Sequence, residues 1–221
     1  MRIDGAHVIG SPCILKLFSG PPDVPKCEVD GAGLKSALAG QFASVYITCR
    51  DNYSNQLSAS SIQGNALTFG LALLSGPAAE NKTARDTVPS MDFDGSWVKS
   101  GTGDGESFEI QYTAKEAGDF ELHVWCDPDG SGVRQWLTGS PFNVRVTGVM
   151  PSNEGSYVGG VDALTSNRVT AGDAIQLRPQ LRDQFGNASA AEPGTFTAHI
   201  ECPDGRHELE LRQLKGLGLY E

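Results

Sequence analysis

The feature that most limits the possible folds is a stretch of sequence that occurs twice. Residues 39–55 begin with Ala-Gly and end with RDNYSN, and residues 171–187 begin with Ala-Gly and end with RDQFGN. Both motifs recur 132 positions apart. Because the offset is the same at both ends, the sequence predicts similar units in tandem, each of about this length.

A second repeated motif, Gly-Ser-Pro followed by an alternating apolar tail, indicates where a unit ends. It occurs at residues 10–12 and 139–141, 129 positions apart. Proline has no backbone donor and suits the first residue of a strand. We therefore expect residues 1–20 to be the closing strand of a preceding unit, 26–147 a complete unit, and 156–221 the N-terminal part of a further, truncated unit.

Apolar residues alternate with polar ones through most of the complete unit, for example at Phe120, Leu122 and Val124. This period of two is typical of half-buried strands, and turn signals rich in Gly, Asp and Asn separate the strands at short intervals. The pattern predicts an all-β fold of antiparallel sandwiches rather than βαβ units. Two connections, at 34–38 and 78–85, contain short helical patterns.

The chain is acidic, with a formal net charge of −10 and a sequence pI near 4.8. Nucleic acids and anionic membrane surfaces need clustered Lys and Arg, so we expect neither as a partner. No stretch approaches 18 consecutive apolar residues, and no membrane insertion is expected within this chain. The expected partners are other proteins.

The sequence contains no arrangement of side chains that predicts catalysis. There is no G-x-S-x-G motif, and the four histidines fall on strands or turns of different units. His123 is expected to be a solvated residue of a strand. We therefore predict a non-enzymatic protein without a cofactor.

Two short stretches have partial metal-ligand patterns. Residues 127–132 (DPDGSG) place oxygen ligands at positions 1, 3 and 5 of a calcium loop, but position 12 is Thr138, and a hairpin turn is favoured. His199, Cys202 and His207 surround a Pro-Asp-Gly turn and are compatible with zinc, although a hairpin with incidental side chains is preferred. No metal site is predicted.

Five short motifs in one order resemble those of the filamin-type (ABP280) immunoglobulin-like repeat. They are Gly33-Leu34, Ala39-Gly40, RDNYSN at 50–55, AGDFELHV at 117–124 and GSPFNVRV at 139–146. The resemblance covers nearly the whole chain and implies tandem immunoglobulin-like sandwiches of seven strands. Two stretches, 58–65 and 76–105, extend beyond a minimal repeat of that family.

The resemblance implies strands A to G in the complete unit and only strands A to D in the further unit, of which we place B, C and D. Trp125 then points outward on strand F, where it marks a contact surface or packing between units. In the complete unit we place the strands at 27–30, 43–50, 67–74, 91–97, 107–113, 119–126 and 142–146, and in the further unit at 175–182, 195–200 and 208–214.

Cys49 and Cys126 are the pair of cysteines singled out by this fold. Both fall at inward positions, at the ends of strands that run parallel in facing sheets, so a disulfide and two buried free thiols both remain open. Asn52, Asn81 and Asn187 begin N-x-[ST] sequons, which accept glycans if the protein is secreted.

Tandem repeats without a catalytic arrangement work as spacers and docking surfaces. The resemblance implies that partners add a strand beside strand C, along Leu67, Phe69, Leu71 and Leu73, although these side chains also suit a core. It implies either a cytoskeletal scaffold in the cytoplasm, which we favour, or an extracellular adhesion array of the gamete-surface kind. Neighbouring repeats or a second copy are further expected partners, with residues 9–17 docking on an open sheet edge.

Overall fold

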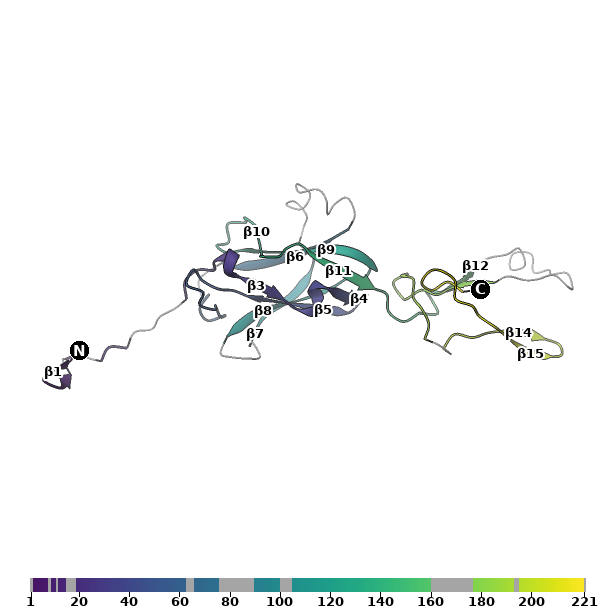
Figure 1. The fold of residues 1–221 in the computed structure, drawn as a ribbon, viewed down its shortest axis with the longest axis horizontal. Helices are drawn as coiled ribbons and strands as arrows, with labels where there is room; N and C mark the ends of the chain where they lie inside the picture. The colour runs from purple at the N-terminus through teal and green to yellow at the C-terminus, as the bar shows by residue number, and fades with distance from the viewer. Residues whose placement is uncertain are drawn as a thin grey trace.

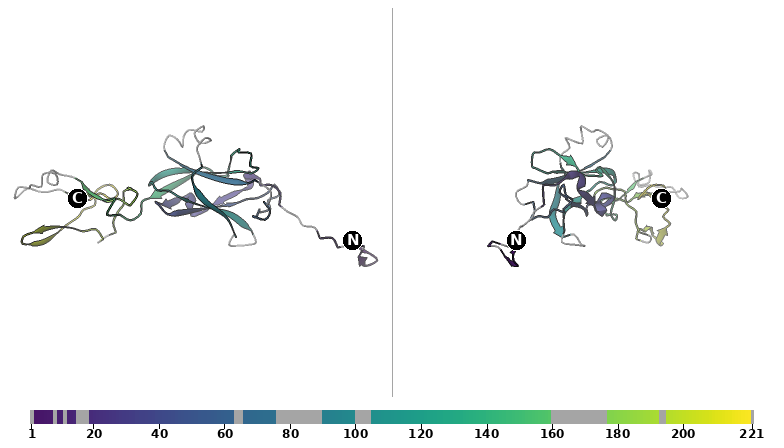
Figure 2. Two further views of the ribbon diagram at one scale, coloured as in Figure 1. Left: turned by 180° about the vertical axis from the view of Figure 1, so that it is seen from behind. Right: turned by 60° about the vertical axis from the view of Figure 1, so that its left-hand side comes forward.

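Alternating burial builds two sheets that lie face to face, as the two views in Figure 2 show, and all their strand pairs except one are antiparallel. The computed structural model describes residues 2–7, 9–10, 12–14, 19–62, 66–75, 90–99, 105–159, 177–192 and 195–220. The first sheet has the order β3 (Glu28–Asp30), β5 (Phe42–Thr48), β8 (Glu106–Thr113) and β7 (Phe93–Lys99).

The second sheet is built around the long strand β9 (Gly118–Asp127). One side of β9 pairs with β6 (Thr68–Leu74), and the other with β11 (Phe142–Thr147) and the short β10 (Gln135–Trp136). Strand β4 (Ser36–Leu38) pairs in parallel with β11 and completes the sheet. We call residues 28–147 the sandwich (Figure 1). Its strands confirm the predicted all-β, immunoglobulin-like fold and the seven predicted strand positions.

The helical pattern predicted at 34–38 is wrong. Residues Ala32–Leu34 form a short 3-10 turn (η2), and β4 follows directly. Leu34 and Ala37 are both buried and mimic a helical spacing, but pairing of Ala37 with Val146 on the closing strand satisfies the backbone instead. The second helical pattern, at 78–85, lies outside the described residues.

The core fills the space between the sheets. Side chains at alternate positions of β5, β8 and β9 have no exposed surface: Val45, Ile47, Ile110, Leu122 and Val124. Burial of each such side chain stabilises the fold by about 1.5–3 kcal/mol.

Tyr112 on β8 is the largest fully buried side chain, and its hydroxyl donates a hydrogen bond to the Gly33 carbonyl (2.6 Å). A side chain at Gly33 would place its Cβ 2.7 Å from the Ser44 carbonyl oxygen, so glycine is required for this close approach. The tyrosine thus joins η2 to the first sheet.

The described part of the C-terminal unit (residues 149–220) contains two short antiparallel pairs. Strand β12 (Tyr157–Gly159) pairs with β13 (Arg178–Gln180), and β14 (Ala198–Cys202) pairs with β15 (Gly205–Leu209). These strands fall at or beside the positions predicted for the further unit. Its assignment as a second repeat stays a prediction.

The first residues form a small hairpin of β1 (Arg2–Ile3) and β2 (Ala6–His7), and a 3-10 turn, η1 (Val24–Lys26), leads into β3. Ile9 and Ile14 are exposed at 102% and 90%, so the described part of segment 9–17 does not fold back onto this chain. Its docking on a second copy stays a prediction. None of the described helices has the length and apolar character of a membrane span.

Candidate functional site

Among the described residues strand β6 pairs with β9 alone, so its other side forms an edge of the second sheet. The Leu71 carbonyl on that side accepts hydrogen bonds from the Met91 N–H (2.9 Å) and the Ser90 hydroxyl (3.3 Å). In an antiparallel strand the N–H and C=O of one residue point to the same side. The backbone groups of Phe69, Leu71 and Leu73 therefore lie along the outer edge.

The side chains of these residues point into the sandwich rather than outward. Leu71 is fully buried, and Phe69 and Leu73 are half-buried against the core, as is Leu67 just before the strand. Phe69 stacks on Phe108 with ring centroids 4.4 Å apart, and Trp97 of β7 meets both rings edge-on. The rings of Phe69, Phe108 and Trp97 therefore form a cluster, which we call the aromatic floor. It lies beside the outer edge of β6 and joins this strand to β7.

The residues around this edge fall within a stretch that a family model recognises. The model for the Filamin/ABP280 repeat matches residues 21–143, which is more than half of the chain. The chain belongs to the filamin/ABP280 repeat family. Filamin repeats are non-enzymatic modules of protein–protein interaction, and membership of this family supports a protein-interaction scaffold.

One solved structure similar to this filamin repeat is the "Crystal structure of the Lin-41 filamin domain". The identity is 12%, the match covers 58% of this chain and 98% of that chain, and the TM-score is 0.35. No curated protein matches the sequence.

Three thiols are buried at one end of the filamin repeat. Cys27, Cys49 and Cys126 are each 1–2% exposed and are free in this structure. Cys49 and Cys126 both face inward, as expected. Cys27 was not predicted to join them, but the ladder pairs Glu28 with Thr48, and one step further along this register Cys27 lies opposite Cys49.

The thiol of Cys49 interacts most strongly with Cys27. A hydrogen bond from Cys49 lowers the pKa of Cys27, and the same bond, together with burial, raises the pKa of Cys49. Burial raises the pKa of Cys126 to about 12. Cys27 is therefore the cysteine of the three that most readily becomes a thiolate, and the thiolate is the species that reacts to give a disulfide.

We expect oxidation to link Cys27 with Cys49 in preference to Cys49 with Cys126. Residues opposite each other in an antiparallel pair have Cα atoms about 4.5–5.5 Å apart, which is within the range for a disulfide. The native chain would be treated with oxidised glutathione, trapped with alkylating agent and mapped by mass spectrometry. If the dominant product were a disulfide-linked peptide pair containing Cys49 and Cys126, this expectation would be wrong and the Cys49–Cys126 disulfide would be supported.

The described sequons differ in their surroundings. Asn52 is exposed, with its Oδ1 3.4 Å from the Lys26 Nζ. The Asn187 Nδ2, the atom that would carry a glycan, donates to the Lys115 carbonyl (2.8 Å) and to Asp183 (2.9 Å). Asn81 lies outside the described residues. Glycosylation of Asn187 is thus incompatible with the contacts it makes here.

The hairpin of β14 and β15 brings together a different trio from His199, Cys202 and His207, for which no metal site was predicted. Ligand atoms of Cys202, Asp204 and His207 lie within 4.8 Å of one another, and all three residues are exposed. His199 instead contacts Arg206, with the Arg206 Nη2 2.9 Å from its Nδ1. Thiolate, carboxylate and imidazole groups are all zinc ligands. Each of the three residues is exposed to solvent, however, and we assign no metal to them.

In the loop at 127–132 the Asp carboxylates accept hydrogen bonds from backbone N–H groups of the same loop. Asp127 accepts hydrogen bonds from the N–H groups of Ser131 (3.1 Å) and Gly132 (2.7 Å), and Asp129 also accepts from Ser131 (3.2 Å). These contacts are those of a turn between two strands.

Trp125 lies on the outer face of the second sheet, as predicted, yet only 5% of it is exposed. The strand β10 folds back along β9, so that Trp136 packs edge-on against it (5.3 Å) and the Arg134 guanidinium lies 4.3 Å from its ring centroid. His123 is 2% exposed, with its Nε2 3.2 Å from Glu121. The prediction of a solvated His123 is therefore wrong, because the same hairpin covers it.

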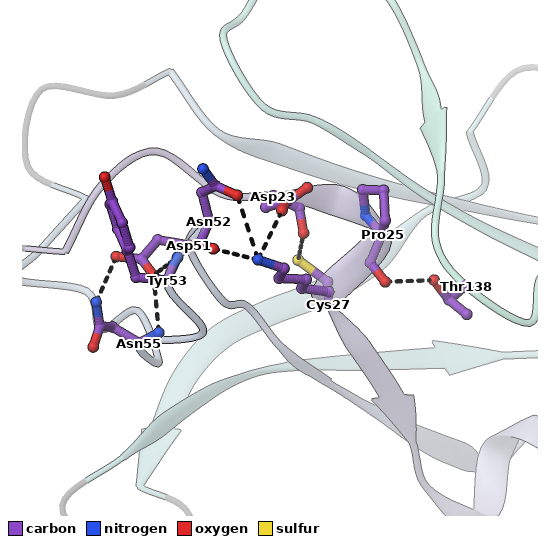
Figure 3. A network of polar contacts seen from close by, with 9 residues as sticks. Asp23, Pro25, Cys27, Asp51, Asn52, Tyr53, Asn55 and Thr138 are labelled. Atoms are coloured by element: carbon purple, nitrogen blue, oxygen red, sulfur yellow. Dashed lines mark hydrogen bonds and ion pairs between the residues drawn. The ribbon is translucent and has the colours of Figure 1, made fainter.

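The RDNYSN motif forms a loop closed around a buried carboxylate (Figure 3). Asp51 is 1% exposed and accepts hydrogen bonds of 2.8–2.9 Å from the N–H groups of Gly20, Tyr53 and Asn55 and from the Asn55 side-chain amide. We call residues 51–55 the first loop. Asp51 thus ties the loop to the segment that enters the repeat.

The RDQFGN motif builds the same geometry 132 residues later, and we call residues 183–187 the second loop. Asp183 accepts from the N–H groups of Phe185 (2.9 Å), Asn187 (2.9 Å) and Val149 (3.1 Å), and from the Asn187 side chain (2.9 Å). Sequence reasoning took both motifs for turn signals. A signal was nevertheless present, because both motifs contain an Asp and an Asn four residues apart, which can bond each other across a turn.

Proposed function

We propose that this filamin-repeat chain is a cytoskeleton-associated scaffold whose partners add a strand along the outer edge of β6. The observation that carries the proposal is the Leu71 carbonyl, which already accepts the Met91 N–H from outside the sheet. The outer edge of β6 can therefore form backbone hydrogen bonds with an extended segment. The neighbouring backbone groups of Phe69 and Leu73 supply further bonds, and the aromatic floor offers apolar contact to alternate side chains of a partner.

The cysteines support the cytoplasmic reading over the adhesion array. The chain has five cysteines, so at least one must stay unpaired within it, and free thiols are typical of a reducing compartment. The exposed sequon at Asn52 is the feature that favours the alternative, an extracellular adhesion array of such repeats. Mass measurement of the native protein before and after deglycosylation separates the two.

Strand addition predicts that Met91→Pro strengthens peptide binding. Proline removes the N–H that occupies the Leu71 carbonyl, so a partner competes for that acceptor only with the longer bond from the Ser90 hydroxyl (3.3 Å). A net hydrogen bond is worth about 1 kcal/mol, and we expect an affinity gain of roughly fivefold. The probes are extended 12-residue peptides of alternating apolar pattern selected on the full chain, and the affinity is measured by fluorescence anisotropy.

Met91→Ala is the matched control, since it shortens the same side chain but keeps the N–H. It should leave the affinity within about twofold. Hydrogen exchange should show that the bound peptide protects the amides of Phe69 and Leu73. Equal affinities for the Pro and Ala variants, or binding without protection of these amides, would contradict strand addition at β6.

A further inference from the structure

The second loop contacts the end of the sandwich. The Asn187 Oδ1 accepts a hydrogen bond from the Ala117 N–H (2.8 Å), and its Nδ2 donates to the Lys115 carbonyl (2.8 Å). Both partners belong to the turn between β8 and β9. The Asn187 side-chain amide therefore makes hydrogen bonds with both an N–H donor and a carbonyl acceptor of the sandwich backbone.

The ring of Phe185 occupies the neighbouring position on the sandwich. A Cβ at Gly40 would lie 2.2 Å from the Phe185 Cζ, so the ring packs where a side chain would otherwise project. Gly40 has φ of +73°, and its N–H donates to the Ala114 carbonyl (2.7 Å), which joins the glycine turn to the β8–β9 turn. These two turns, residues 39–41 and 114–117, form what we call the receiving end.

The first loop presents the same groups without a partner. Tyr53 stands at the position of Phe185 and is 83% exposed, whereas Phe185 is half-buried. Asn55 stands at the position of Asn187; it is exposed, and its Oδ1 has no hydrogen-bond partner within the described part of the chain. In Figure 3 the Asn55 side-chain amide and the backbone N–H of Tyr53 both bond Asp51.

The entry segments also match. Asp51 binds the Gly20 N–H as Asp183 binds the Val149 N–H. Gly20 and Val149 are 129 positions apart, which is the spacing of the two Gly-Ser-Pro motifs. Gly20 therefore precedes the first loop at the position that Val149, which follows β11, takes before the second loop.

We propose that the first loop is a docking surface for the receiving end of another filamin-type repeat placed ahead of residue 21. The Tyr53 ring covers the glycine of that repeat's first turn, and the Asn55 amide bonds the backbone of its β8–β9 turn. This inference does not depend on strand addition at β6.

The first test asks whether a tyrosine loop can occupy a receiving end. In the full chain Phe185→Tyr gives the second loop the ring of the first, and Phe185→Ala removes the ring. We expect the Ala117 amide to exchange about tenfold faster in the Ala variant and within about twofold of wild type in the Tyr variant. Tyr53→Ala is the matched control, and it should leave Ala117 exchange unchanged.

The second test supplies the missing partner. A second copy of residues 21–149 replaces residues 1–20, so that its Val149 takes the place of Gly20. Tyr53→Ala and Asn55→Ala in the following repeat should each speed exchange of the Ala117 amide of the added copy by about tenfold. Protection of the Ile110 amide in both copies checks that each repeat is folded.

Two results would overturn the proposal. One is a Phe185→Tyr chain that exchanges at Ala117 as fast as Phe185→Ala. The other is an added copy whose Ala117 exchange is unchanged by Tyr53→Ala and Asn55→Ala while its core amides stay protected.

Discussion

Replacing Tyr112 by Ala should lower the free energy of unfolding of the sandwich by about 3–5 kcal/mol. The ring is 1% exposed and fills the space between the two sheets, and its hydroxyl bonds the Gly33 carbonyl. The variant leaves a cavity and an unpaired buried carbonyl. Urea unfolding followed by tryptophan fluorescence reports on the sandwich, because Trp97, Trp125 and Trp136 all belong to it.

Tyr112→Phe is the matched control. It keeps the ring and removes the hydroxyl, so the loss should be about 1–2 kcal/mol, the cost of leaving one buried acceptor without its donor. If the Ala and Phe variants lose the same amount, the ring does not contribute to the core as described.

Lowering the pH from about 4 to about 2 should destabilise the sandwich through Asp51. The hydrogen bond from the Asn55 side chain, with those from backbone N–H groups, lowers the pKa of Asp51 from 3.8 to about 2. The folded state therefore binds fewer protons than the unfolded chain across this window. The stabilisation is present above pH 4 and is lost as the pH falls through the folded pKa.

Asp51→Asn cannot titrate and should flatten the pH dependence in the same window. The measurement is the melting temperature of the tryptophan signal at several pH values from 2 to 6. We also expect Asp51→Asn to melt below wild type at pH 6, because an amide nitrogen replaces an oxygen that accepts hydrogen bonds. Parallel curves for the two proteins below pH 4 would show that other carboxyl groups cause the acid transition.

The strands of the sandwich could be predicted because burial on one face leaves a period of two in the sequence. Positions such as Val45, Ile47 and Ile110 alternate and are fully buried. β4 could not be found in this way, since it is three residues long and is defined by a partner more than 100 positions away. Its own spacing of apolar residues resembled a turn of helix.

The position of strand β6 could be predicted, and its use as a binding edge stays a prediction. The sequence located the edge at Phe69, Leu71 and Leu73, whereas the bond from Met91 depends on how the connection returns to β6. Cys27 was missed as a neighbour of Cys49 because their approach follows from the register of two strands. Trp125 was correctly placed on the outer face, but its burial depends on the fold-back of β10.

The parallel pairing of β4 with β11 has a mechanical consequence. The chain reaches β4 at its N-terminal end and leaves β11 at its C-terminal end, and in a parallel pair these ends lie at opposite extremes. Tension applied through the two flanks, once β3 has yielded, therefore slides the strands along each other. The bonds that join Lys35 to Arg145 and Ala39 to Thr147 then carry load together with the ladder between them, so the pair resists stretching as one unit instead of opening bond by bond.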